Sequence, residues 1–335
     1  MTDFTVAIPT YNGAQRLPEV LNQLRSQSGT EHLSWEVIVV DNNSNDNTAQ
    51  VVQNYQATWS QGHQLRYCLE TQQGVAFARQ RAVEEAQGQY IGFLDDDNLP
   101  ASDWVAAAYT FGVTHPQAGA YGSQIQGEFE VEPPEDFQRI AYILALTNRG
   151  PEAHPYEPRK KILPPGAGLV VRKQAWCETV PSQLTLNHTG KEAGLASEDL
   201  EVLLHIQQAG WEIWYNPEMC VSHKIPAWRL KREYLMRSFR CVGLSRHHLR
   251  MMPLSAWQRP LAMPLYAAND LRKLILCLIK YRGAIKTDLV AACEVELFSG
   301  SLLSPLFLWR IKHFSRPKPQ KTCSAKVQPQ LNASQ

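Results

Sequence analysis

Three consecutive aspartates, Asp95, Asp96 and Asp97, follow an apolar run in the stretch YIGFLDDDN (residues 90–98). Adjacent carboxylates repel one another, so a positive partner is expected close to them. Because the run before them is typical of a buried strand, we expect the aspartates at a strand end. Hard carboxylate oxygens suit Mg²⁺ or Mn²⁺, which bind one or two protein carboxylates and complete their shell with substrate phosphates. The pattern therefore predicts a metal that carries a diphosphate.

Other interpretations of the aspartates exist. A solvated acidic loop is the simplest, and the residues alone leave it open. A phosphatase-type DxDx[TV] motif would make Asp95 a nucleophile, but Leu99 stands where Thr or Val is required. The GxGxxG and GxxxxGK[ST] phosphate loops are both absent from the sequence, which argues against a dinucleotide dehydrogenase or a P-loop kinase.

Two more predicted strands end in polar residues. The first, FTVAIPTYN (4–12), ends in a Pro-Thr-Tyr-Asn turn, and the second, WEVIVVDNNSNDNT (35–48), runs into Asp41. Asp41 could accept hydrogen bonds from a base or a ribose. The asparagines after it are typical of turns and helix caps.

Glu198 and Asp199 open a predicted helix, SEDLEVLLHIQQAG (197–210), which has an N-cap serine and a terminal glycine. Such carboxylates can act as a general base, but they also complement the helix dipole without any catalytic role. His223 ends a short strand, MCVSH, and could be a ligand or a structural histidine. Both choices remain open from the residues alone.

The elements that position these residues alternate between strands and helices. A helix is expected at 74–88, between a strand at 64–70 and the strand at 90–94, and WEIWYNP and MCVSH are expected as two short strands. This alternation predicts an α/β fold with a mostly parallel central sheet. In such sheets the ligand lies beyond the carboxyl ends of the strands, so the polar strand ends should line one cleft.

The composition is that of a globular protein, with 335 residues and 44% hydrophobic side chains. Asp3 and Pro9 interrupt the opening residues, so no signal peptide is expected. No uninterrupted apolar run approaches the roughly 18 residues of a membrane-spanning helix. The seven cysteines are scattered and form no CxxC pair, which favours reduced thiols and a cytoplasmic location.

The formal net charge of +1 hides a strong asymmetry along the chain. Residues 1–228 hold 14 basic against 27 acidic side chains, whereas residues 229–286 hold 13 against two. We therefore expect an α/β domain at 1–228, a basic helical region at 229–314 and a disordered tail at 315–335. A nucleic acid partner is disfavoured, because the neighbouring acidic domain would repel it. The Leu- and Ile-rich helix at 265–282 instead favours an anionic membrane surface, with a buried core helix as the alternative.

Taken in order, these stretches resemble a known family. IPTYN (8–12), VVDNNSNDNT (39–48), QQGVAFARQRAVEEAQGQYIGFLDDDN (72–98) and SED (197–199) are similar to the family 2 glycosyltransferases of the GT-A fold. The resemblance covers roughly residues 4–225. With the basic region that follows, the chain also resembles bacterial exopolysaccharide transferases of the cyanobacterial hormogonium type.

The resemblance implies roles for individual residues. Asp199 would be the general base, with Glu198 as the alternative, and Asp97 and His223 would bind Mn²⁺ or Mg²⁺. The residues that would bind the nucleotide sugar are Pro9, Tyr11, Asn12, Asp41, Gly74, Arg79, Asp95 and Asp96. Gln72 and Gln80 depart from the asparagines that the family often has, which puts local contacts in doubt but not the reaction.

The expected function is inverting transfer of a sugar from a nucleotide-diphosphate sugar to a hydroxyl of a glycan or lipid-linked acceptor. The protein would be a cytoplasmic enzyme, peripheral on the inner face of the plasma membrane. Two alternatives are a non-catalytic assembly partner and a sugar nucleotidyltransferase. The second lacks the Gly-rich, basic N-terminal loop that it would need.

Overall fold

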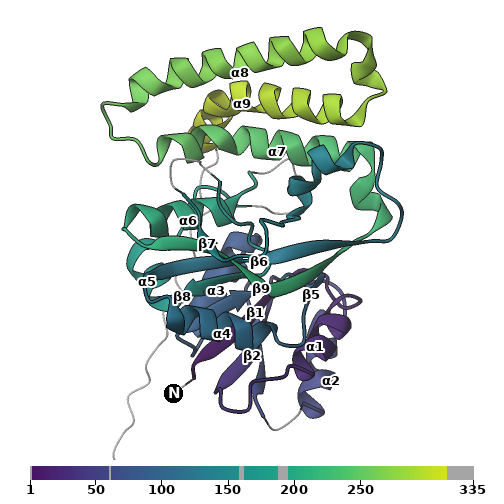
Figure 1. The fold of residues 1–335 in the computed structure, drawn as a ribbon, viewed down its shortest axis with the longest axis vertical. Helices are drawn as coiled ribbons and strands as arrows, with labels where there is room; N and C mark the ends of the chain where they lie inside the picture. The colour runs from purple at the N-terminus through teal and green to yellow at the C-terminus, as the bar shows by residue number, and fades with distance from the viewer. Residues whose placement is uncertain (1, 60–61, 158–161, 188–194, 315–335) are drawn as a thin grey trace, which may run out of the picture.

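The computed structural model describes residues 2–59, 62–157, 162–187 and 195–314. An α/β domain carries a nine-stranded sheet, and three long helices lie together beyond one end of it (Figure 1). The strands of this domain end at Ile225, and the long helices follow from Arg232 onward. The predicted tail at 315–335 lies outside the described residues.

The sheet has the strand order β3-β2-β1-β4-β8-β6-β9-β5, with β7 paired to β9. Its strands are β1 (Phe4–Thr10), β2 (Trp35–Asp41), β3 (Gln64–Leu69), β4 (Tyr90–Phe93), β5 (Asn98–Pro100), β6 (Ala118–Phe129), β7 (His154–Pro155), β8 (Leu169–Arg172) and β9 (Glu212–Ile225). From β3 to β4 all neighbours are parallel, as expected.

Beyond β4 the sheet is mixed, and only part of it follows the parallel pattern expected from the sequence. Strand β8 runs antiparallel to both β4 and β6, and β9 runs antiparallel to β5 and β7 but parallel to β6. A parallel pair needs a long crossover connection. The chain reaches β8 through an irregular segment, and the hydrophobic periodicity of a strand does not predict whether it runs parallel or antiparallel to its neighbours. WEIWYNP and MCVSH form one strand, β9, whose register against β6 shifts between Ser123 and Gln124.

Alternation along the strands explains the two layers of helices. Val6 and Ile8 of β1 point into one core, and Ala7 between them points into the other. The first core lies under α1 (Leu17–Arg25), α2 (Thr48–Ala57) and α4 (Trp104–Thr114). The second lies under α3 (Val75–Glu85), α5 (Lys173–Thr179) and α6 (Glu198–Gln208). The helices predicted at 74–88 and 197–210 are thus confirmed as α3 and α6.

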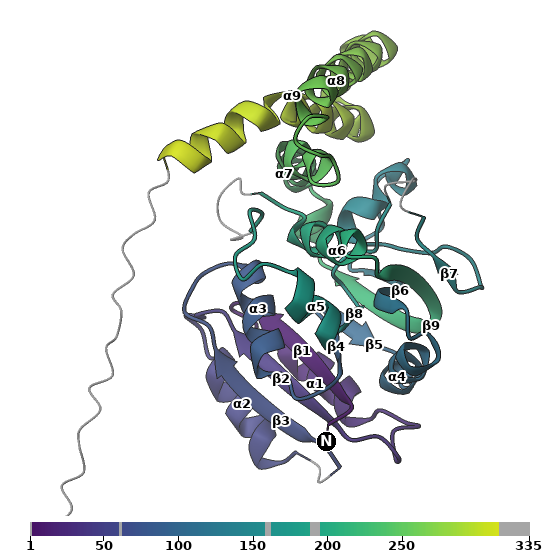
Figure 2. The same cartoon turned by 90° about the vertical axis from the view of Figure 1, so that its left-hand side faces the viewer.

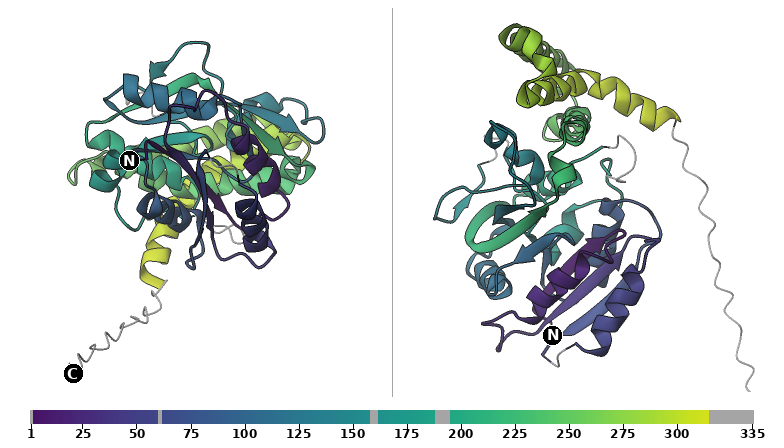
Figure 3. Two further views of the ribbon diagram at one scale, coloured as in Figure 1. Left: turned by 90° about the horizontal axis from the view of Figure 1, so that it is seen from below. Right: turned by 90° about the vertical axis from the view of Figure 1, so that its right-hand side faces the viewer.

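The helical region consists of the long helices α7 (Arg232–Met251), α8 (Arg259–Tyr281) and α9 (Leu289–Phe314). The described residues also form the short helices η1 (Phe137–Arg139), η2 (Ala141–Leu144), η4 (Ala227–Leu230) and, between α8 and α9, η5 (Arg282–Lys286). Helix α7 lies nearest the sheet and α8 farthest from it, and the end of α9 projects to one side (Figures 1, 2 and 3). Gly243 lets α7 and α9 approach closely, because a Cβ there would lie 2.6 Å from the Leu297 carbonyl oxygen.

Helix α9 also bears on the question of a membrane. Although the sequence lacks a long uninterrupted apolar run, residues 289–313 are long and apolar enough to cross a membrane by length and composition. The N-terminal half of α9 packs in the helical region, where Val290 and Cys293 join a buried cluster with Leu235 and Phe239 of α7. Length and composition alone therefore do not decide between a spanning helix and a packed one.

Candidate active site

The ends of β1 and β4 are joined through Asp96. Both of its carboxylate oxygens accept hydrogen bonds from Arg16, at 2.7 and 2.8 Å, and the Thr10 hydroxyl donates a further bond at 2.5 Å. Arg16 precedes α1, so this bidentate pair ties the first loop of the chain to the triple aspartate. The positive partner expected near the aspartates is therefore partly supplied by the protein. These contacts make Asp96 a residue that positions its neighbours.

Asp41 and Asn12 lie in a second cluster at the ends of β1 and β2. The Asp41 carboxylate accepts hydrogen bonds from the Tyr67 hydroxyl at 2.8 Å and the Ser44 backbone N–H at 2.9 Å. The Ser44 hydroxyl in turn accepts a bond from the Asn12 backbone N–H at 2.9 Å. Asn12 has a φ of 51°, a left-handed conformation that asparagine tolerates. Pro9 is buried within β1 directly opposite Val40, and Tyr11 follows at the strand end.

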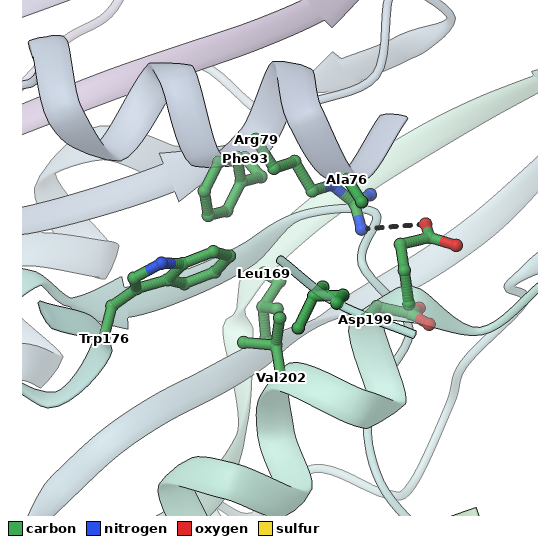
Figure 4. Close-up of a pocket in the computed structure, with 9 residues that line it drawn as sticks. Ala76, Arg79, Phe93, Leu169, Trp176, Asp199 and Val202 are labelled. Carbon is green, nitrogen blue, oxygen red and sulfur yellow. Dashed lines mark hydrogen bonds and ion pairs between the residues drawn. The ribbon is translucent and has the colours of Figure 1, made fainter. Parts of the chain in front are cut away.

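Arg79 is the buried centre of a third cluster. Its guanidinium lies 3.3 Å from Glu198 Oε1, drawn as a dashed line in Figure 4, and 3.6 Å from Asp95 Oδ1. Only 6% of the residue is exposed, and its guanidinium lies over the Phe93 ring. One side chain on α3 thus connects the aspartate at the end of β4 with the carboxylate at the start of α6. Sequence reasoning placed all three residues in the site, and the structure brings them together.

Burial and mutual repulsion shift the protonation of these carboxyl groups. Burial, together with the charge of Asp199, raises the pKa of Glu198 to about 7, although Arg79 opposes the shift. Burial and the neighbouring Asp97 also raise the pKa of Asp95 above its usual value. Near neutral pH, Glu198 therefore exchanges a proton readily, which is a property of groups at functional sites.

Asp199 is held at the N-terminus of α6 by backbone donors. Its Oδ2 accepts the Gly166 N–H at 2.7 Å, and its Oδ1 accepts the Leu200 N–H at 2.8 Å. Gly166 has no room for a side chain, because a Cβ there would lie 2.4 Å from the Arg79 guanidinium. The side chain of Asp199 is less buried than that of Glu198, so it is the more accessible of the two carboxylates. Both remain candidates for the base by position.

Asp97 and His223 lie opposite Asp95, where β5 pairs with β9. The Asp97 carboxylate contacts Arg229 at 2.7 Å and Asn98 at 3.1 Å, and its Oδ1 lies 3.6 Å from His223 Nε2. Burial raises the pKa of Asp97, but contacts with His223 and Arg229 outweigh it, so the pKa lies below the usual value. The carboxylate is thus kept ionised, which is the form that binds a cation. Arg229 is a neighbour that sequence reasoning missed.

The chemistry of these side chains fits a divalent cation. The carboxylates of Asp95 and Asp97 and the imidazole of His223 are ligand types used by Mg²⁺ and Mn²⁺. Among the residues that the structure describes, no three His, Cys, Asp or Glu side chains are arranged as a complete metal site.

Gly74 begins α3 and is fixed by two asparagines. Its N–H donates to Asn42 Oδ1 at 2.7 Å, and its φ of 136° is a conformation that favours glycine. A Cβ on Gly74 would lie 2.0 Å from the Asn187 side chain, whose Oδ1 also caps the Ala76 N–H. Asn42 was interpreted as a turn residue, which its backbone contacts fit. Asn187 was missed, because no local pattern links it to a helix more than 100 residues earlier.

A small pocket opens beside the Arg79 cluster (Figure 4). Its wall is formed mainly by apolar residues from α3, β4, β8, α5 and α6, with Arg79, Glu198 and Asp199 at one side; the labelled ones are Ala76, Arg79, Phe93, Leu169, Trp176, Asp199 and Val202. The charged groups therefore adjoin an apolar space, which accounts for the strong effect of burial on Glu198.

The chain was then compared with known proteins. The family described as "Glycosyl transferase family 2" matches residues 5–167, which contain Asp41, Arg79 and Asp95–Asp97 but not Glu198, Asp199 or His223. The segment of residues 5–167 belongs to glycosyltransferase family 2. The resemblance expected from the sequence is thereby confirmed, and the cyanobacterial type stays a prediction.

Relatives of the family 2 domain include bacterial and archaeal proteins. Glycosyltransferase AglE of Haloferax volcanii is 33% identical over 102 residues, which cover 30% of this chain and 32% of AglE. A GalNAc(5)-diNAcBac-PP-undecaprenol beta-1,3-glucosyltransferase of Campylobacter jejuni is 31% identical over 100 residues, covering 29% of this chain and 30% of that protein. The matched part thus spans about a third of the length of these relatives.

A solved structure extends the likeness beyond the family 2 domain. Mannosyltransferase PcManGT from Pyrobaculum calidifontis, solved with GDP-Man and Mn²⁺, aligns with a TM-score of 0.57 and 18% sequence identity. The alignment covers 91% of this chain and 86% of PcManGT. This likeness shows the fold alone and confirms the expected GT-A type.

Proposed function

We propose that the protein is an inverting glycosyltransferase that moves a sugar from a nucleotide-diphosphate sugar to a hydroxyl of a glycan or lipid-linked acceptor in polysaccharide biosynthesis. The observation that carries this proposal is the Arg79 cluster, in which one buried guanidinium joins Asp95 and Glu198, with Asp199 beside them. Donor-side and acceptor-side carboxylates are thereby held within one site. Membership of family 2 supports the same reaction class.

The donor would bind across the carboxyl ends of β1, β2 and β4. Asp41, fixed by hydrogen bonds from Tyr67 and Ser44, would accept further hydrogen bonds from a base or ribose. Asn12 and Tyr11 would close the other side of the nucleotide. Asp95 and Arg79 would lie toward the ribose and the phosphates, and Gly74 would let the α3 N-terminus approach the donor closely. The mannosyltransferase of similar fold was solved with a nucleotide-diphosphate sugar, which agrees with this placement.

Asp199 is our choice for the general base. In the reaction, its carboxylate removes the proton from the acceptor hydroxyl while that oxygen forms a bond to C1 of the donor sugar. The bond from C1 to the diphosphate breaks on the opposite face, so the configuration at C1 inverts. Two backbone N–H bonds fix the Asp199 carboxylate in place. Positioned base catalysis of this kind contributes about 10²–10⁴-fold to a rate.

Glu198 serves a different purpose in this proposal. Glu198 forms an ion pair with Arg79 and is more buried than Asp199. We therefore place it on the donor side, where it would partly neutralise the charge of Arg79. A pKa of about 7 would also suit a base, so Glu198 is the alternative to Asp199. Replacement of each residue separates the two assignments.

A divalent cation, Mn²⁺ or Mg²⁺, would be held by Asp97 with Asp95 and His223 near it. When bound, such a cation supplies positive charge that stabilises the departing diphosphate. The contribution of the chain is to keep Asp97 ionised and to fix its direction through Asn98. PcManGT was solved with Mn²⁺, which supports a cation of this class.

The helical region would bring the enzyme to the cytoplasmic face of a membrane that contains its acceptor. Large apolar side chains are exposed just before α8, along α8 and on the C-terminal half of α9. This set, here called the outer helical face, consists of Trp257, Leu261, Met263, Leu265, Leu271, Ile275, Leu276, Leu278, Ile279, Leu303, Leu306, Trp309 and Ile311. Basic side chains of α8 such as Arg272, Lys273 and Lys280 stand among them. Apolar and basic groups on one helix are typical of interfacial binding to anionic lipid. One relative is named for an undecaprenol-linked substrate, in line with a lipid-linked acceptor.

A donor screen tests the proposal. Purified protein is incubated with UDP-, GDP- and dTDP-sugars, with and without Mn²⁺, while nucleotide release and thermal shift are measured. We expect metal-dependent release of one nucleotide, and we expect its loss in Asp97→Ala. Glu31→Gln, an exposed change on the same domain, is the matched control. Well-folded protein that neither binds nor consumes any donor would contradict the proposal and favour a non-catalytic assembly partner.

A further inference from the structure

Arg229 makes the same contacts that a metal ion would make at Asp97 and His223. Its Nη2 lies 2.7 Å from Asp97 Oδ2, and its Nη1 lies 2.9 Å from His223 Nε2. Arg229 comes from η4, the short helix between β9 and α7, and therefore from the basic region. Its side chain is only 22% exposed, so the contact is largely shielded from solvent.

The hydrogen-bond network assigns the state of His223. A guanidinium can only donate, so His223 Nε2 must accept the bond from Arg229. The other ring nitrogen, Nδ1, lies 2.9 Å from the Leu144 carbonyl oxygen, which can only accept, so Nδ1 carries the proton. In this arrangement the Nε2 lone pair faces Arg229. A metal would need that lone pair and the Asp97 oxygen, and Arg229 occupies both.

This arrangement is not fully satisfied. Arg229 Nε is buried and finds no hydrogen-bond partner among the described residues. A buried donor without a partner costs stability. This cost makes the contact of Arg229 with Asp97 and His223 easier for a cation to displace. Because the guanidinium keeps its charge at any ordinary pH, it cannot share these two ligands with a second cation.

We propose that Arg229 is a resident counter-ion of the donor site, which a divalent cation must displace from Asp97 and His223 before it binds. The inference rests on the proposed metal at Asp97. Because Arg229 lies on η4 directly before α7, its release would loosen the junction between the α/β domain and the helical region. Occupation of the donor site would thereby be coupled to that junction.

Manganese binding to the donor-free protein tests the competition. Free Mn²⁺ is measured by electron paramagnetic resonance during titration of wild type, Arg229→Gln and Arg16→Gln. Arg16→Gln is the matched control, because it removes an equal charge from the adjacent Asp96 without touching Asp97. We expect Arg229→Gln to bind Mn²⁺ about tenfold more tightly than wild type, which corresponds to about 1.4 kcal/mol. The control should gain much less.

Hydrogen exchange of the peptide around residues 226–235 supplies a readout independent of affinity. We expect Mn²⁺ to accelerate exchange there in wild type, and we expect Arg229→Gln to exchange fast already without metal. Equal Mn²⁺ affinities in wild type and Arg229→Gln would overturn the competition. So would an equal rise in Mn²⁺ affinity in Arg229→Gln and Arg16→Gln, if hydrogen exchange around residues 226–235 did not change. Either result would leave the proposed metal site itself intact. Absence of Mn²⁺ binding in every protein would overturn both the metal site and the inference.

Discussion

Arg79, Asp95 and Glu198 show how single residues set the chemistry of the site. A buried guanidinium would be costly alone, and its two carboxylate partners make it tolerable. The negative charges exceed the positive ones locally, because Asp199 and Asp97 stand close by. Burial, together with this excess of negative charge, raises the pKa values of Asp95 and Glu198. These residues should therefore also affect the pH dependence of stability.

Glu198 should make folding stability fall as pH rises. Its pKa in the folded protein is about 7, above the ordinary value of 4.5, so the folded state holds the proton more tightly than the unfolded state. The resulting stabilisation is complete below about pH 4.5 and is lost as pH rises through 7. Glu198→Gln removes this titration. We expect similar Tm values for variant and wild type at pH 5, and a higher Tm for the variant at pH 8.

The comparison is made by differential scanning fluorimetry over a pH series. Glu31→Gln, an exposed change, should follow wild type at every pH. A constant difference in Tm between Glu198→Gln and wild type from pH 5 to pH 8 would mean that Glu198 has an ordinary pKa in the folded protein.

At the scale of elements, the loop before β8 connects the two halves of the site. Gly166 packs against Arg79 and donates its N–H to Asp199, so one backbone position touches both the donor-side and the base-side residues. Ser123 adds a further constraint by donating its hydroxyl to the Gly168 carbonyl at 2.7 Å. Ser123 of β6 thereby holds the loop in place. The position of the Asp199 carboxylate depends on this loop, because Gly166 donates a hydrogen bond to it.

Gly166→Ala should damage activity more than stability. The new Cβ would press on the Arg79 guanidinium, whose ion pairs allow little movement, so both Arg79 and Asp199 should shift. We expect kcat/KM for nucleotide release to fall by about tenfold or more, since misplaced catalytic groups lose rate steeply. Gly283→Ala is the control, because a Cβ there meets nothing within 4 Å. Unchanged kcat/KM in Gly166→Ala would show that the loop does not position the site.

Much of this element arrangement is predictable from sequence. The parallel strands β1 to β4, helices α3 and α6, and the positions of Asp41 and Asp95 after strand ends follow from period, strand ends and caps. What sequence could not supply depends on distant partners. Arg16 and Asn187 act across 80 and 111 residues, and Arg229 contacts Asp97, which lies more than 100 residues earlier. No local pattern marks these contacts. The antiparallel β8 was missed for the same reason, because its neighbours are fixed by packing.

At the scale of the whole molecule, the helical region is tied to the catalytic domain through α6. His248 of α7 lies 2.9 Å from Glu201 of α6, which also accepts backbone bonds from Thr185 and Leu186. Asp199 belongs to the same α6 helix, so the proposed base and the basic helices share one support. Helix α8, which carries many residues of the outer helical face, lies farthest from the sheet (Figures 1 and 2).

The outer helical face should bind anionic membranes. Leu261→Ser/Leu265→Ser removes two side chains that are 63% and 71% exposed. Since burial of a leucine contributes about 1.5–3 kcal/mol, the double change should weaken binding to phosphatidylglycerol liposomes by at least about tenfold in a sedimentation assay. Val113→Ser, on the exposed surface of α4, is the matched control. Wild-type protein that stays unbound at low salt would contradict the membrane proposal.

The measurement that tests the central claim most directly compares donor binding and turnover in Asp199→Asn. The asparagine side chain has the shape of aspartate and keeps an oxygen that can accept a backbone hydrogen bond. Its amide cannot take up the proton of the acceptor hydroxyl. We predict donor and metal affinities close to those of wild type, together with a fall in kcat of about 10²–10⁴-fold. Glu198→Gln should keep much more of its turnover. Near-normal turnover of Asp199→Asn with unchanged donor binding would contradict the account.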